Sequence, residues 1–214
     1  MSKTSFPPSH IPLGPWYEGM EPGAAVAKYM EKAQYEYSRV DDRELRDVKT
    51  GERVWLNGTT TKADAELKVM KERQAAEKVI RAQYDTAREK VRRSIAKPMP
   101  SGVREQIATM KQLGATPTEV EALQRTYADS YLAQRLIQAE LMDDSTPGTQ
   151  IMAPAVDDVL GELDHTESLA LRALSVNPEE AHLSYDAQLV AKGNVTRNSL
   201  NSAEVFDSMF GGDK

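Results

Sequence analysis

Cysteine is absent from the 214-residue chain, which removes disulfides, thiolate metal ligands and cysteine nucleophiles together. Aromatic residues are scarce at 6%, and only three are phenylalanine, so a hydrophobic core can form but would be thin. No apolar run approaches the roughly 20 residues that a membrane-spanning helix needs, and no apolar signal segment opens the chain. We therefore expect a reducing, cytoplasmic compartment and no membrane partner.

Motifs for catalysis and cofactor binding are also missing. The chain contains no GxxxxGK[ST], GxGxxG, GxSxG or HExxH pattern, so we expect no enzyme activity and no cofactor. Two pairs, Glu162 with His165 and Glu179 with His182, have the spacing of helical di-iron ligands. The second pair follows a turn expected near Asn177, whereas Glu162 lies about four helical turns earlier. The pairs would not face each other, and we expect no metal site.

Charge is unevenly distributed along the chain. The net charge is −6, but residues 71–97 hold nine basic and four acidic side chains, and residues 119–180 hold three basic and thirteen acidic ones. Such polarity can attract copies of the chain head to tail or bridge partners of opposite charge. Two solvated helix faces would explain the same pattern.

An extended arm is predicted for residues 1–20, because four prolines fix the backbone and remove amide donors. Apolar side chains recur along this arm, and burying them requires a partner or the chain's own domain. We predict that they bind a partner; they are Phe6, Ile11, Leu13 and Trp16.

Residues 21–97 form the first predicted domain, made of a helix over 22–40, a β-hairpin over 45–56 and a long helix over 64–96. Thr50-Gly51 supplies the hairpin turn, and Trp55 is expected to pack on a helix or a partner. The long helix contains no Gly or Pro and carries a narrow apolar stripe like a coiled-coil seam. The stripe consists of Leu67, Met70, Ile80, Tyr84, Ala87, Val91 and Ile95.

Residues 98–193 form a second, helical domain, because Pro and Gly interrupt the chain at residues 97–102. A helix is expected over 103–113. A further helix to about residue 142 begins at Thr116, where Pro117 and Glu119 complete a capping pattern. Helices over 155–174 and from Asn177 to about Lys192 follow. Gly114 gives the first two helices a helix-turn-helix spacing, although Glu119 and Glu121 would repel DNA phosphates and a plain helical hairpin is the alternative.

One basic cluster stands out at the end of the long helix. It consists of Arg88, Lys90, Arg92, Arg93 and Lys97. It can contact nucleic-acid phosphates or an acidic protein face, or it can be a solvated helix face.

Residues 194–214 are predicted to form a polar linker and a short amphipathic helix. This helix of about two turns would not be stable alone, so its apolar residues are expected either to dock in a partner's groove or to pack on their own domain. They are Val205, Phe206, Met209 and Phe210.

The sequence thus predicts a mainly α fold with elongated helices, one small β-hairpin, an extended N-terminal arm and a short C-terminal helix. An arm, a narrow-striped helix, charge polarity and a terminal anchor together favour a non-catalytic assembly protein. It would be a repeated subunit, scaffold or adaptor in a larger complex such as a virus (phage) particle, binding other proteins and copies of itself. The suggestion of a virus particle rests on analogy with the architecture of particle components. The alternative is a nucleic-acid-binding packaging or regulatory factor that uses the basic cluster.

Overall fold

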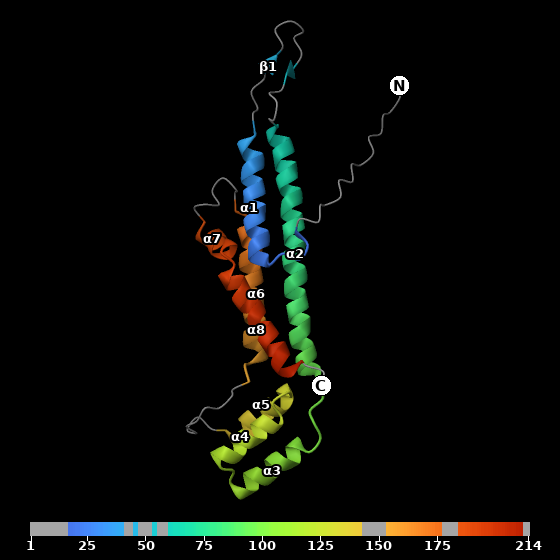
Figure 1. Cartoon of the computed structure of the whole chain (residues 1–214), viewed down its shortest axis with the longest axis vertical. Coiled ribbons are helices and arrows are strands. Elements are labelled where there is room, and N and C mark those ends of the chain that lie inside the picture. The colour runs from blue at the N-terminus through green and yellow to red at the C-terminus, as the bar shows by residue number, and fades with distance from the viewer. Residues whose placement is uncertain are drawn as a thin grey trace, which may run out of the picture. The chain divides into compact units, whose positions relative to one another are not determined.

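The computed structural model describes residues 17–40, 45–46, 53–54, 60–142, 153–176 and 184–211. Within these ranges the chain forms eight helices and two short strands, which confirms a mainly α fold (Figure 1). The elements are α1 (Pro22–Ser38), β1 (Leu45–Arg46), β2 (Arg53–Val54), α2 (Lys62–Ala96), α3 (Val103–Leu113), α4 (Pro117–Thr126), α5 (Tyr131–Leu141), α6 (Val156–Ala173), α7 (Tyr185–Ala191) and α8 (Asn194–Phe210).

The chain divides into two compact units, each assembled from two stretches of sequence. Unit 1 comprises Met1–Ala82 and Ser168–Thr196, and unit 2 comprises Gln83–Glu167 and Arg197–Lys214. Since the boundaries fall inside helices, α2, α6 and α8 each contribute residues to both units. The two units are described separately below.

The two strands pair antiparallel, with Leu45 opposite Val54 and Arg46 opposite Arg53. This pairing lies within the range expected for the hairpin. The expected turn at Thr50-Gly51, together with Trp55, falls outside the described residues, as does the arm over residues 1–16.

In unit 1, α1 lies antiparallel to the first part of α2. Lys32 Nζ contacts both carboxylate oxygens of Glu72 at 3.0 Å, and one turn further along α1 Glu36 accepts a hydrogen bond from Lys68 Nζ at 3.1 Å. The residue numbers of the paired side chains rise along α1 and fall along α2, so the two helices run in opposite directions, as Figure 1 also shows. Beneath these ion pairs α1 buries a row of side chains four residues apart, Ala25, Tyr29 and Ala33, with Val26 beside the row.

A glycine allows α1 to approach α7 closely. A Cβ atom added at Gly23 would lie 2.6 Å from the Cα of Gly193 and 2.7 Å from the carbonyl oxygen of Val190. Gly193 follows α7 with φ +77°, a conformation that glycine adopts without the steric cost that a Cβ imposes. Both glycines are therefore required by backbone geometry at this crossing.

In unit 2, α3, α4 and α5 pack around a small apolar core. Each helix contributes two buried residues: Val103 and Ile107, Val120 and Leu123, and Ala133 and Ile137. The predicted start of α4 is confirmed, because the Thr116 amide donates to Glu119 Oε2 at 2.8 Å while the Thr116 hydroxyl accepts from the Glu119 amide. This is the reciprocal capping arrangement.

The single helix expected from Pro117 to about Met142 is wrong. The structure interrupts it at residues 127–130, and α5 begins anew where the Ser130 hydroxyl accepts from the Ala133 amide at 3.3 Å. The interruption lets α4 and α5 fold back on each other over the shared core. The Ser130 side chain, inside a stretch of good helix formers, therefore marks the start of a new helix.

The polar linker expected over residues 194–202 is instead the first half of α8, which continues for 17 residues to Phe210. Polar side chains of this half are hydrogen bonded. Thr196 Oγ1 donates to the Gly193 carbonyl at 3.1 Å in unit 1. Ser199 Oγ accepts from Thr166 Oγ1 at 2.8 Å in unit 2. Ser, Thr and Asn have modest helix propensity, and packing overrides it.

We predict opposite effects of alanine at two helical glycines. Gly23→Ala should lower the free energy of unfolding by about 2 kcal/mol, because its methyl group would collide with the backbone of residues 190–193. The matched control, Gly161→Ala in α6, should raise it by about 0.5–1 kcal/mol, since nothing lies within 4 Å of the added Cβ. Denaturant titration followed by far-UV circular dichroism measures both. A neutral Gly23→Ala would contradict the close approach of α1 and α7.

Candidate functional site

Five of the residues predicted to bind partners lie outside the described part of the chain, and for them the prediction stays a prediction. They are Phe6, Ile11, Leu13, Trp16 and Trp55.

The C-terminal aromatic residues pack inside unit 2. Phe206 and Phe210 are both 1% exposed, and their ring centroids lie 5.2 and 5.4 Å from that of Tyr131 and 5.0 Å from each other. Such separations suit edge-to-face and tilted aromatic contacts. Of the four residues proposed as a terminal anchor, Met209 is half-buried and only Val205, at 56%, remains well exposed. These two phenylalanines are therefore core residues of unit 2, the second of the two alternatives.

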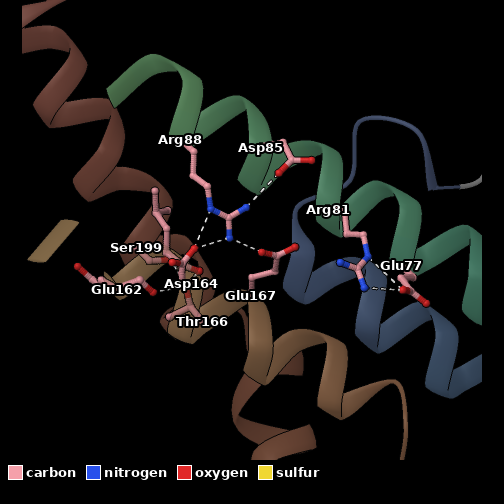
Figure 2. Close-up of polar contacts among 10 residues, drawn as sticks. Glu77, Arg81, Asp85, Arg88, Glu162, Asp164, Thr166, Glu167 and Ser199 are labelled. Atoms are coloured by element: carbon pink, nitrogen blue, oxygen red, sulfur yellow. Dashed lines mark hydrogen bonds and ion pairs between the residues drawn. The ribbon is translucent and has the colours of Figure 1, made fainter. Parts of the chain in front are cut away.

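The basic cluster does not form one uniform surface. Arg88 points from α2 toward α6 and is only 14% exposed (Figure 2). Its guanidinium contacts Asp164 Oδ1 at 2.7 Å, Asp85 Oδ1 at 3.1 Å, and the carboxylate of Glu167, which is 12% exposed. The Arg88 guanidinium therefore forms ion pairs with three carboxylates of its own unit.

The other members of the basic cluster differ in their surroundings. Lys90 Nζ lies 3.7 Å from Glu204 Oε1 of α8. Arg93, 68% exposed, lies 3.7 Å from Glu89, and Arg92 is exposed with no ion pair or hydrogen bond to another described residue. Lys97 is half-buried. The basic surface that a partner could reach therefore consists chiefly of Arg92 and Arg93.

A small buried polar group lies beside Arg88. The hydroxyls of Thr166 and Ser199 are hydrogen bonded at 2.8 Å, and the fully buried Tyr84 hydroxyl lies next to them without meeting hydrogen-bond geometry. Burial raises the pKa of Tyr84, although its neighbours Thr166, Ser199 and Arg88 partly oppose the shift. These contacts tie α2, α6 and α8 together within unit 2, and we assign them a structural role.

Unit 1 contains a half-open cleft of about 540 Å³, a volume within the range of ligand and peptide pockets. Residues from α1 and just after it, from the first part of α2, and from the segment that follows α6 line it. They are Tyr29, Tyr37, Val40, Lys62, Glu66, Val69, Met70, Arg73, Leu174, Ser175 and Val176.

Two residues of the apolar stripe predicted for α2 are exposed at this end of the helix, and one of them, Met70, lines the cleft. Met70 is 49% exposed and Leu67 is 47% exposed, so the single stripe that joined them to the buried Ile80 was wrong. The buried face at this end consists instead of Ala65 and Val69. Helical spacing extended backward from Ile80 through Ala76 leads to Val69 and Ala65, which are the buried residues.

Charged and hydroxyl groups border the same cleft. Arg73 Nη2 donates to Ser175 Oγ at 2.8 Å, which links α2 to the residues that follow α6. Lys62 and Glu66 lie on the same face of α2. Burial raises the pKa of Tyr29, and the nearby positive charge of Arg73 partly offsets that shift. The cleft lining therefore combines apolar side chains with two cations, Lys62 and Arg73, and one anion, Glu66.

The pair Glu162 and His165 remains exposed on α6. Among the described residues, no three or more His, Cys, Asp or Glu side chains lie close enough together to hold a metal ion. In the same part of the chain, no helix combines the length and apolar character needed to cross a membrane. Comparison with known proteins returned no matching family model, no matching curated sequence and no matching solved structure.

Replacing Arg88 should be costly, and replacing Arg92 should not. Arg88→Met leaves the Glu167 carboxylate, only 12% exposed, without its cation, which we expect to lower the free energy of unfolding by roughly 2–3 kcal/mol. Arg92→Met, on the same helix but exposed, should change it by less than about 0.5 kcal/mol. Urea unfolding compares the two variants. Equal effects would show that the Arg88 network does not stabilise unit 2.

Stability should also fall at alkaline pH. The folded protein keeps Tyr84 neutral to a higher pH than the unfolded chain does, so its contribution is complete below about pH 10 and is lost as pH rises further. The loss per buried tyrosine is at most about 1.4 kcal/mol per pH unit. Tyr84→Phe should therefore flatten the decline in unfolding free energy measured between pH 9 and pH 11. An unchanged slope would mean that Tyr84 ionises equally in both states.

Proposed function

We propose that this chain is a non-catalytic assembly protein, a repeated subunit, scaffold or adaptor, that binds other proteins through the cleft of unit 1. One observation carries the proposal: Met70, which lines that cleft, and Leu67, one helical turn away on α2, are both large apolar side chains left exposed. Covering such apolar surface removes it from water, which favours association.

The chemistry of the cleft supports a protein partner. Tyr, Met and Arg are the side chains most enriched at protein interfaces, and the lining includes Tyr29, Tyr37, Met70 and Arg73. The cleft is also half-open, so a ligand seated there would keep one side in solvent. A protruding side chain of a larger molecule satisfies that arrangement.

The wider setting of a larger complex, such as a virus particle, rests on analogy between this architecture and particle components. In that setting the protein would act in the cytoplasm and in the assembled particle. The exposed Val205 and the N-terminal apolar residues would provide further contacts.

A second candidate is a nucleic-acid-binding packaging or regulatory factor. Its support is the exposure of Arg92 and Arg93 near the end of α2. Phosphate contacts by these side chains would make binding strongly salt-dependent. Because Arg88 and Lys90 contact acidic residues of α6 and α8, fewer cations than the sequence offers would reach the phosphates.

Met70→Glu should release the protein from its complex. The change places a charge in the cleft at an exposed helical position, so the free energy of unfolding should change by less than about 0.5 kcal/mol while partner binding is lost. Gradient sedimentation of extracts from cells making the tagged full chain measures this. The wild type should travel in a larger assembly and the variant as free chain.

Leu132→Glu, at another exposed leucine, is the matched control and should sediment with the wild type. If the wild-type chain itself travels free in such extracts, the proposal of an assembly protein fails.

A further inference from the structure

The turn between α3 and α4 presents the most exposed large apolar side chain described in the chain. Leu113, the last residue of α3, is 81% exposed. Gly114 follows with φ +74°, so the helix ends there and the chain turns toward Thr116. Val120 and Leu123 of α4 face the core, whereas Leu113 at the end of α3 keeps most of its side chain in solvent. We refer to residues 113–119 as the tip.

The tip also carries a fixed negative charge. Glu119 Oε2 accepts hydrogen bonds from the Thr116 amide at 2.8 Å and from the Thr116 hydroxyl at 2.7 Å, which hold the carboxylate against the turn. These bonds lower the pKa of Glu119, whose side chain is exposed to solvent, so it is ionised at neutral pH. The tip therefore combines an apolar side chain with a nearby anion.

The cleft of unit 1 has the complementary chemistry. Its apolar residues include Val69, Met70 and Leu174, and its charged residues are Lys62, Arg73 and Glu66, which together carry a net charge of +1. Arginine has five N–H donors, and the hydrogen bond from Arg73 to Ser175 uses one of them. A carboxylate entering the cleft beside an apolar side chain would meet Arg73 as a charge-assisted partner.

We propose that the cleft of one copy of this chain binds the tip of a second copy, with Leu113 against the apolar lining residues and Glu119 toward Arg73. This inference rests on the proposed function and names the partner at that cleft. Every copy carries both surfaces, and the two surfaces differ, so the contact is head to tail and can be repeated from copy to copy. The sequence polarity agrees, because the acidic stretch 119–180 begins at the tip and the basic stretch 71–97 begins beside the cleft.

Sedimentation equilibrium of the purified full chain tests the contact. The average mass of the wild type should rise with protein concentration. Leu113→Glu and Met70→Glu should each weaken self-association at least about tenfold, because each places an unpaired charge at the centre of the contact. Leu132→Glu should associate as the wild type does. All three positions are exposed, so equal thermal unfolding midpoints will show that folding is intact.

Mixing the two defective variants gives the sharper measurement. Leu113→Glu keeps a working cleft and Met70→Glu keeps a working tip, so an equimolar mixture should form one-to-one heterodimers that grow no further. A symmetric interface, in which both residues meet their own counterparts, could not produce this pairing.

Each adverse result has a distinct meaning. A wild type that stays monomeric at all concentrations overturns the inference, while the assembly function survives if the chain still travels in a larger complex in extracts. Wild-type association in Leu113→Glu, with loss in Met70→Glu, overturns the tip as occupant and leaves the cleft as a binding site. A mixture without heterodimers overturns the head-to-tail contact.

Discussion

The row of residues that α2 buries constrains most of the other features described here. Ala65, Val69, Ala76, Ile80 and Tyr84 form one continuous row at four- or seven-residue spacing. Each residue turns a helix by about 100°, so this row decides where every other side chain of α2 points. With it buried, Leu67 and Met70 are exposed, and the ion pairs between α1 and α2 form at the edges. Further along, the same row directs Arg88 inward and leaves Arg92 in solvent.

Because Arg88 points inward, fewer of the cations near the end of α2 form an exposed basic surface than the sequence indicates. Read along the sequence, five cations near the end of α2 look like one basic surface. In the folded unit, Arg88 contacts three carboxylates, and Lys90 lies near a fourth, that of Glu204. Some of the basic side chains of α2 and acidic side chains of α6 therefore form ion pairs with each other within one chain. Fewer of these charged side chains remain for partners. The charged side chains of the cleft and of the tip remain as well.

Local signals in the sequence predicted a large share of the helices. Proline at the first turn of α1, the break at residues 97–102 and the cap at Thr116 each fixed a boundary, because the groups responsible lie within a few residues of it. The break before Ser130 and the helical start of α8 were missed. The first depends on α4 and α5 sharing a core, and the second on hydroxyls that bond across unit 2. The cleft was missed because small residues, Ala65 and Val69, decide which face of α2 is buried. Hydrophobicity alone favoured the larger Leu67 and Met70.

The division of the chain between its two units has a consequence for biosynthesis. Unit 1 combines Met1–Ala82 with Ser168–Thr196, so 85 residues of unit 2 are synthesised between its two parts. At about 5–20 residues per second a ribosome needs on the order of ten seconds to cover that distance. During this interval the apolar faces of α1 and α2 lack the part of α7 that closes against Gly23. Until residues 168–196 are synthesised, the first stretch of unit 1 therefore lacks part of the surface that covers its apolar faces.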